Sequence, residues 1–183
     1  NVGETGHKEN GMRLWTWCFR AALYTVYKIS PSRGSDVLVD VLGEEFDGVL
    51  GCDYFSAYRK FMKDFNVVVQ FCLAHFIRDV KFLVEHPNPK NRQHGELLLG
   101  HLRQLFHIIH SRDEYPTEVG FRRALGRVRN ELVDDAIFHS PGTQEADNLS
   151  NRFLNHFDGF FTFMTTPGIE PTNNLAEQAI RFV

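Results

Sequence analysis

Two acidic residues stand where a carboxylate could hold a metal ion. Asp53 directly follows residues 48–52, a short apolar run that predicts a buried strand. In open α/β sheets, ligands bind beyond the carboxyl ends of such strands. Glu177 falls in the first turn of a predicted C-terminal helix. Because Mg²⁺ is bound through carboxylate oxygens, Asp53 and Glu177 are the candidates for a metal-dependent site.

Each of these acids also has a purely structural interpretation. Asp53 could cap a helix that begins at Tyr54, and spacing alone favours this interpretation. Asn174 and Glu177 approximate a capping box, in which the N-cap residue and the residue three positions on satisfy each other's backbone amides. The local sequence therefore leaves a structural and a catalytic role open for both acids.

Cys72 and His75 form a C-x-x-H pair at the start of a predicted helix. A structural zinc site needs four ligands, and no second pair with ligand spacing follows. A buried thiol and a hydrogen-bonded histidine are therefore favoured over zinc binding. A local basic set surrounds the same region, and it is either a solvated face or a phosphate contact. Its members are Arg59, Lys60, Lys63, Arg78 and Lys81.

Strand and helix signals alternate along the first half of the chain. Aromatic and β-branched residues predict two adjacent strands at 14–20 and 22–29. Residues 36–42 fit a strand or a helix, and the two glutamates that follow favour the helix. Further on, strands are predicted at 48–52 and 67–71, and helices at 54–65 and 72–84. Such alternation is typical of an α/β sheet.

The second half of the chain is predicted to be helical. Apolar residues recur there at helical spacing, as in the stripe Leu98, Leu102, Leu105 and Ile109. The pattern predicts a core made of residues 1–85 and 166–183, with an all-helical insertion at 86–165 before the closing helix.

Composition excludes several classes of protein. The 183 residues are 43% hydrophobic and 23% charged, which is ordinary for a globular protein and excludes a disordered chain. No apolar run approaches the roughly 18 residues of a membrane span. A net charge of −3 provides no general attraction for nucleic acid. Three cysteines predict reduced thiols, and the polar opening residues predict no signal peptide. We expect the chain, which starts at Asn1, to be part of a longer protein.

Read in order, the motifs resemble one family. The residues that carry the resemblance are NVGETG, GVLGCDYFSAY, QFCLAHFIRD and PTNNLAEQAIR. They are similar to motifs of the DDE transposases of bacterial insertion sequences, specifically the insertion sequence 66 family. The resemblance covers nearly the whole chain. It implies a ribonuclease H-like core sheet flanked by helices, with an all-helical insertion before the last catalytic helix. It also implies a transposase that cuts and rejoins DNA at the ends of a mobile element.

The resemblance assigns roles to residues of this chain. Asp53 would be the second catalytic acid and Glu177 the third, separated by 177 − 53 = 124 positions. With a first acid they would hold two Mg²⁺ or Mn²⁺ ions, one on each side of the transferred phosphoryl group. Residues that match the supporting motifs are Cys72, His75, Asn173 and Asn174. Candidate DNA contacts are Arg59, Lys60, Arg78 and Arg181.

The same resemblance implies the partners of the protein. These would be the terminal inverted repeats of the element and the target DNA, bound by an oligomer. The expected location is the bacterial cytoplasm, in association with the nucleoid and with no membrane.

The first catalytic acid is where the chain departs from the family. The family's opening strand reads D-E-T-G, with the Asp as a metal ligand, whereas this chain has Gly3, Glu4, Thr5 and Gly6. Glu4 cannot replace that Asp, because successive side chains of a strand point to opposite faces. A slipped register, a deliberate change or a decayed copy would each explain Gly3, and a decayed or altered copy is favoured.

Two other functions remain open from the sequence. One is a non-catalytic DNA-binding or assembly module that keeps the fold, which Gly3 supports. The other is a ribonuclease H-like nuclease or resolvase that does not join strands. If the transposase interpretation holds, we expect the carboxylates of Asp53 and Glu177 to lie within about 8 Å, since two catalytic ions lie about 4 Å apart.

Overall fold

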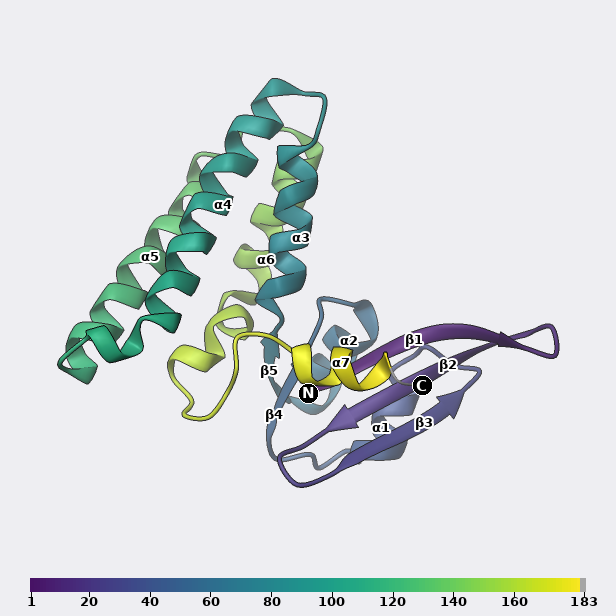
Figure 1. Ribbon diagram of the computed structural model, residues 1–183. Coiled ribbons are helices and arrows are strands. Elements are labelled where there is room, and N and C mark those ends of the chain that lie inside the picture. Colours follow the sequence, from purple (N-terminus) through teal and green to yellow (C-terminus); the bar gives the residue numbers. More distant parts are fainter. Residues whose placement is uncertain (182–183) are drawn as a thin grey trace. The chain divides into compact units, whose positions relative to one another are not determined.

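In the computed structural model, which describes residues 1–181, the chain opens with an antiparallel sheet (Figure 1). Its strands are β1 (Val2–Glu9), β2 (Met12–Arg20) and β3 (Thr25–Ser30), in the order β1-β2-β3. Asn10 and Gly11 form the turn between β1 and β2, with φ angles of 49° and 81°. Two-residue hairpin turns require such left-handed angles, so Asn-Gly fixes the register of this hairpin.

A parallel pair of strands follows. β4 (Val49–Cys52) and β5 (Val68–Phe71) are joined by helix α2 (Ser56–Phe65), because parallel neighbours need a crossover connection. Helix α1 (Asp36–Leu42) precedes β4, so the helical alternative for this segment is confirmed. Strands and helices thus alternate, and the predicted α/β class is confirmed.

The last described helix, α7 (Asn174–Ile180), packs against β1 and β2 (Figure 1). The hydroxyl of Tyr27 on β3 donates to the carbonyl of Ala179 at 3.2 Å. Before the helix, the carbonyl of Pro171 accepts from the amide of Leu73 at 2.9 Å. Since these bonds join residues far apart in sequence, they fix α7 on one face of the antiparallel sheet.

Aromatic side chains fill the core beneath the strands. Trp17 of β2 is fully buried and meets the ring of Tyr58 on α2 edge to face, with centroids 6.0 Å apart. Phe71 and Phe160 are also buried, with centroids 5.2 Å apart. Gly159 allows this contact, because a Cβ there would lie 2.8 Å from the ring of Phe71. The 3₁₀ helix η2 (Thr162–Met164) follows directly.

Four helices and a short 3₁₀ segment make up the middle of the chain. They are α3 (Leu73–Val84), α4 (Pro89–His110), η1 (Arg112–Glu114), α5 (Glu118–Phe138) and α6 (Gln144–Phe161). Asn88 and Thr117 cap α4 and α5 by accepting backbone hydrogen bonds. Ile108, not the predicted Ile109, continues the buried stripe of α4, because burial follows the 3.6-residue turn. Among the described residues of 86–165, none forms a strand.

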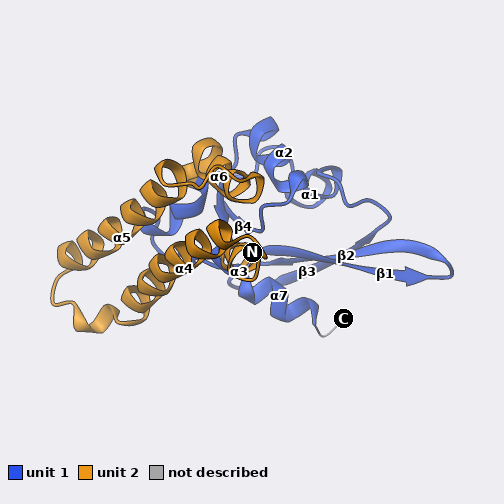
Figure 2. Cartoon of the chain, turned by 90° about the horizontal axis from the view of Figure 1, so that it is seen from above, with its two compact units in different colours: residues 1–74, 159–183 blue, residues 75–158 orange. Residues whose placement is uncertain are grey.

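The chain divides into two units (Figure 2). Unit 1 contains Asn1–Ala74 and the chain from Gly159 onward, and unit 2 contains His75–Asp158. The first division falls inside the predicted core segment 1–85, so the boundaries of the predicted insertion stay predictions. No helix within residues 1–181 has both the length and the apolar character to cross a membrane.

Candidate functional site

Position 3 faces the carboxylate of Glu177. A Cβ built on Gly3 would lie 3.0 Å from Oε1 of Glu177 and 3.3 Å from Cδ1 of Ile180. Gly3 pairs with Cys18 on β2, and after burial the charge of Glu177 is among the causes that raise the pKa of the Cys18 thiol. The side chain of Glu177 therefore lies over the start of β1, and any side chain at position 3 would touch it.

Glu4 lies on the other face of β1. Its side chain is 2% exposed and accepts hydrogen bonds from Nε and Nη2 of Arg33, at 3.0 and 2.8 Å, and from the hydroxyl of Tyr58. The Arg33 guanidinium lies 4.3 Å from the ring centroid of Trp15 and 4.1 Å from that of Phe55. Because these partners consume its oxygens, Glu4 is a structural acid and does not replace an acid at position 3.

Asp53 comes directly after β4 and is partly buried. Its Oδ1 accepts a hydrogen bond from the amide of Phe55 at 2.8 Å, before α2 begins at Ser56. The predicted helix start at Tyr54 is therefore wrong by two residues, and the N-cap position belongs to Phe55. This bond from a side chain to the backbone two residues on is an Asx turn, and it holds the carboxylate at the end of the strand. Oδ2 accepts no hydrogen bond from the described residues.

The acid at position 53 also acts on Glu4. Burial raises the pKa of Glu4, the hydrogen bond from Tyr58 opposes this, and the negative charge of Asp53 raises it further. At the start of the strand, the side chain of Asn1 lies against Gly51 of β4, 2.6 Å from where a Cβ would stand. Asn1 therefore lies near Gly51, and Glu4 lies near enough to Asp53 to feel its charge. Because both pairs advance in the same sense along the sequence, β1 and β4 run in the same direction.

Asn173 joins α7 to the sheet. It is 1% exposed, and its Nδ2 donates to the carbonyl of Val2 at 3.0 Å and to Oε1 of Glu177 at 3.5 Å. Its Oδ1 is buried without a hydrogen-bond partner among the described residues. The N-cap of α7 is Asn173 and no side chain caps the helix, so the predicted capping box of Asn174 with Glu177 is wrong. The carboxylate of Glu177 instead points toward β1. The simplest structural explanation of Glu177, a capping role, is therefore excluded.

Cys72 belongs to the same surroundings, whereas His75 begins the other unit. The amide of Asn173 donates to Sγ of Cys72 at 3.4 Å, and the amide of Cys72 donates to the carbonyl of Cys52 at 2.7 Å. Cys72 is thus a buried junction between β4, β5 and the segment before α7, as its structural interpretation expects. His75 lies in unit 2, the helical unit.

The predicted DNA contacts divide between the two units. Arg59 and Lys60 lie on α2 in unit 1, Arg181 follows α7 there, and Arg78 lies on α3 in unit 2. Lys60 is paired with Asp64 on its own helix. The guanidinium of Arg59 lies 4.6 Å from the centroid of Tyr54, and its Nε is buried without a hydrogen-bond partner among the described residues.

The described residues do not complete a metal site. Within residues 1–181, no group of three or more His, Cys, Asp or Glu is arranged to hold an ion. The chemistry of the donors present is suitable, since carboxylate and amide oxygens bind Mg²⁺. There are too few such donors, because Gly3 has no side chain that could provide a ligand beside Glu177.

The sequence alone does not reveal which residues surround Glu4. Arg33 lies in a polar segment that the sequence marks only as a break between elements, and Tyr58 is one of several aromatic residues of α2. A signal was available, because Glu4 alternates with Gly3 and must find a partner on the opposite, buried face of the strand.

This geometry defines a mixed α/β protein with an acidic helix residue aimed at its first strand. A family model described as the transposase IS66 family matches residues 1–183, and the chain belongs to this family. No curated protein and no solved structure matches the chain.

Proposed function

We propose that this chain is the catalytic domain of a DDE-type DNA transposase whose acidic site lacks its first carboxylate. The observation that carries the proposal is the approach of position 3 to Glu177, at 3.0 Å from a Cβ. An Asp at position 3 would place a second carboxylate against the first. In this chain, residues 1–85 and 166–183 would form the catalytic core, and 86–165 the insertion between the second and third acids.

The arrangement of strands supports a ribonuclease H-like core. The antiparallel strands lie in the order β3-β2-β1, and β4 pairs in parallel with β5. β1 contacts β4 and runs in its direction, so the order along a continuous surface would be 3-2-1-4-5. The proposed fold has this order, with the first acid on the central strand.

Asp53 would be the second acid of the site. The start of β1 indicates which residue lies beside Asp53. Asn1 lies beside Gly51 of β4, so two residues further along each chain segment Gly3 would lie level with Asp53. The third acid, Glu177, is held over Gly3 by α7. Acids from β1, the end of β4 and α7 would therefore converge once position 3 carried a carboxylate, and Mg²⁺ or Mn²⁺ would be the ions they hold.

DNA is the proposed substrate, as element ends and as target, and the active form would be an oligomer on DNA in the bacterial cytoplasm. Arg59, Lys60, Arg78 and Arg181 remain candidates for phosphate contacts. For Arg59 the support is that its guanidinium lies against Tyr54, the residue after Asp53, and that its Nε has no hydrogen-bond partner among the described residues.

A cleavage assay with the full-length protein tests this proposal. Gly3→Asp should gain Mn²⁺-dependent nicking of a duplex that carries the element end. Gly3→Asn is the matched control, because it has the same shape without the charge, and it should remain inactive. Adding Glu177→Gln to Gly3→Asp should abolish the gained cleavage. Absence of cleavage in Gly3→Asp, or cleavage that survives Glu177→Gln, would overturn the proposal.

Gly3 itself favours a second candidate, a non-catalytic DNA-binding or assembly module. Under this alternative the side chains around Glu177 serve only to hold α7 on the sheet. Gly3→Asp would then bind DNA as the unaltered protein does and would gain neither metal affinity nor cleavage. The same assay therefore separates the two candidates.

A further inference from the structure

We propose that the β1–β2 hairpin is a second DNA-binding surface, on which Lys8 and Arg13 contact phosphates away from the acidic site. The identification of DNA as the ligand rests on the proposed function, whereas the positively charged surface is a feature of the hairpin itself. The two residues lie directly opposite each other in the strand register.

Lys8 and Arg13 form a like-charged pair that the hairpin does not neutralise. Cross-strand neighbours have Cβ atoms about 4.5–5.5 Å apart, and like charges at this distance oppose strand pairing. Neither residue forms an ion pair with any residue in the described part of the chain. Both are exposed, and the adjacent Glu9 belongs to the other face, where it pairs with Met12. A bound anion would relieve this repulsion.

Arg13 is held in place before any ligand arrives. Its guanidinium lies 4.7 Å from the ring centroid of Trp15, whose ring also contacts Arg33 at 4.3 Å. Trp15 lies over Gly6, where a Cβ would stand 3.0 Å from the indole. Because Arg33 is bound by the buried Glu4, the indole is fixed, and Arg13 loses little freedom when it binds a phosphate.

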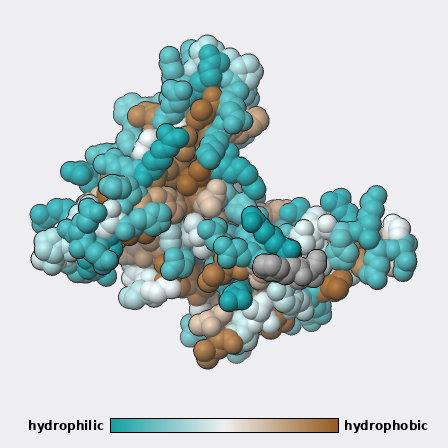
Figure 3. Space-filling view, in the orientation of Figure 1, coloured by the Kyte–Doolittle hydropathy of each residue, from teal (hydrophilic) through white to brown (hydrophobic). Residues whose placement is uncertain are grey.

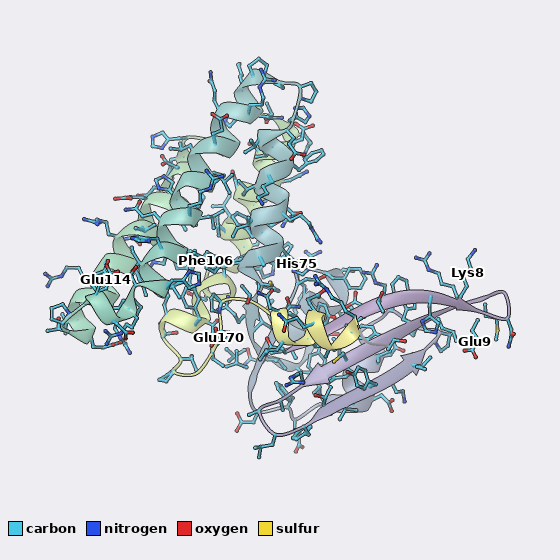
Figure 4. All side chains as sticks on the ribbon, in the orientation of Figure 1. Lys8, Glu9, His75, Phe106, Glu114 and Glu170 are labelled. Atoms are coloured by element: carbon cyan, nitrogen blue, oxygen red, sulfur yellow. The ribbon has the colours of Figure 1, made fainter. Side chains whose placement is uncertain are left out.

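The surroundings of the pair are open and hydrophilic. Gly6, His7, Lys8 and Arg13 line a shallow depression of about 470 Å³. Figure 3 shows the hairpin end as mostly hydrophilic surface, and Figure 4 shows Lys8 and Glu9 directed to opposite sides of it. Lys8 therefore presents its charge to solvent on a face from which the nearest carboxylate of the turn is directed away.

A nucleic-acid backbone suits this surface better than a single small anion. Lys8 is five strand positions from Gly3, or about 17 Å at about 3.3 Å per residue. That length corresponds to roughly five phosphates of one DNA strand at about 3.4 Å each. Lys8 alternates with Gly3 along β1 as Glu4 does, so it lies on the opposite face of the strand. Lys8 and Arg13 would therefore contact a segment of DNA other than the one at the acidic site. Repeated phosphates would also give Lys8 and Arg13 separate partners.

Fluorescence anisotropy with a short labelled DNA duplex, in EDTA, tests the proposal. The test variant is Lys8→Gln with Arg13→Gln. The matched control is Arg123→Gln with Arg127→Gln, which removes two exposed charges from α5. Each lost phosphate contact should lower the slope of log affinity against log salt by about 0.9, so the test variant should lose about 2. The corresponding affinity loss at 0.1 M salt is up to about 60-fold.

A second variant guards against misfolding. Lys8→Glu places opposite charges across the hairpin, so it should melt at the same or a higher temperature while binding DNA more weakly. Because EDTA removes metal, Glu177→Gln should bind DNA like the unaltered chain, which separates this proposal from the catalytic one. The proposal is overturned if the unaltered chain does not bind duplex DNA, or if the test and control variants lose the same slope.

Discussion

Replacing Arg33 by Met should destabilise the protein in a pH-dependent way. Arg33 donates two hydrogen bonds to Glu4, whose side chain is 2% exposed, while its own side chain is 39% exposed. Met keeps much of the apolar stem against Trp15 and Phe55 but removes the cation. The variant therefore leaves a carboxylate buried with only Tyr58 as a hydrogen-bond partner.

The magnitude follows from the ionisation of Glu4. Burial already raises its pKa, and both the hydrogen bonds and the charge of Arg33 lower it, so the variant should raise it further. A carboxyl with a raised folded pKa contributes stability that is complete below its usual value of 4.5 and is lost as pH rises through the folded pKa. The largest loss at pH 7 is the free energy of keeping Glu4 protonated, about 3 kcal/mol at about 1.4 kcal/mol per pKa unit. Loss of the two cation–π contacts adds about 1–2 kcal/mol at any pH.

Urea unfolding of the protein at several pH values measures this effect. Destabilisation by Arg33→Met should grow by up to about 3 kcal/mol from pH 4.5 to 7. Adding Glu4→Gln should remove this growth, since no ionisable group remains. Lys28→Met, which breaks the exposed pair with Asp40, is the control and should cost at most about 1 kcal/mol. Destabilisation by Arg33→Met that is equal at both pH values would refute the assignment of Glu4 as a buried acid that depends on Arg33.

Three further substitutions test the packing of the structure by urea unfolding. Gly159→Ala should destabilise by about 1–3 kcal/mol, because its Cβ would stand 2.8 Å from the ring of Phe71. Gly126→Ala, inside α5 with nothing within 4 Å of the added Cβ, should instead stabilise by about 0.5–1 kcal/mol; a loss there would contradict the helix assignment. Asn173→Ala should cost about 1–3 kcal/mol and speed hydrogen exchange in α7, because Asn173 binds the carbonyl of Val2. Unchanged exchange would show that Asn173 does not anchor the helix.

Periodicity and motif order predicted most elements of the chain. The strands predicted at 14–20 and 67–71 match β2 and β5, with ends that differ by at most two residues. These segments are rich in β-branched and aromatic residues, which favour strands. The strand predicted at 22–29 begins only at Thr25, since residues 22–24 lie in the connection between β2 and β3. A short connection and a strand start have similar composition here, so sequence alone does not separate them.

The candidate site was harder to predict from the sequence than the fold, because its contacts join residues far apart in the chain. The alternation of β1 was enough to separate Gly3 from Glu4. The partners of Glu4 were not predictable, since Arg33 and Tyr58 are 29 and 54 positions away and only the folded sheet brings them together. The N-cap of α7 was misplaced for a related reason: Asn173 binds the first strand, a contact that no local spacing reveals.

Calorimetric titration with Mn²⁺ shows whether position 3 is the missing metal ligand beside Glu177. We expect Gly3→Asp to bind Mn²⁺ at least tenfold more tightly than the unaltered protein, a gain of about 1.4 kcal/mol. Gly3→Asn should show no such gain. In the absence of metal, Gly3→Asp should be slightly less stable, because the new carboxylate stands next to Glu177 and must displace it by a few tenths of an ångström. Equal Mn²⁺ affinity in Gly3→Asp and the unaltered protein would show that position 3 is not the missing ligand.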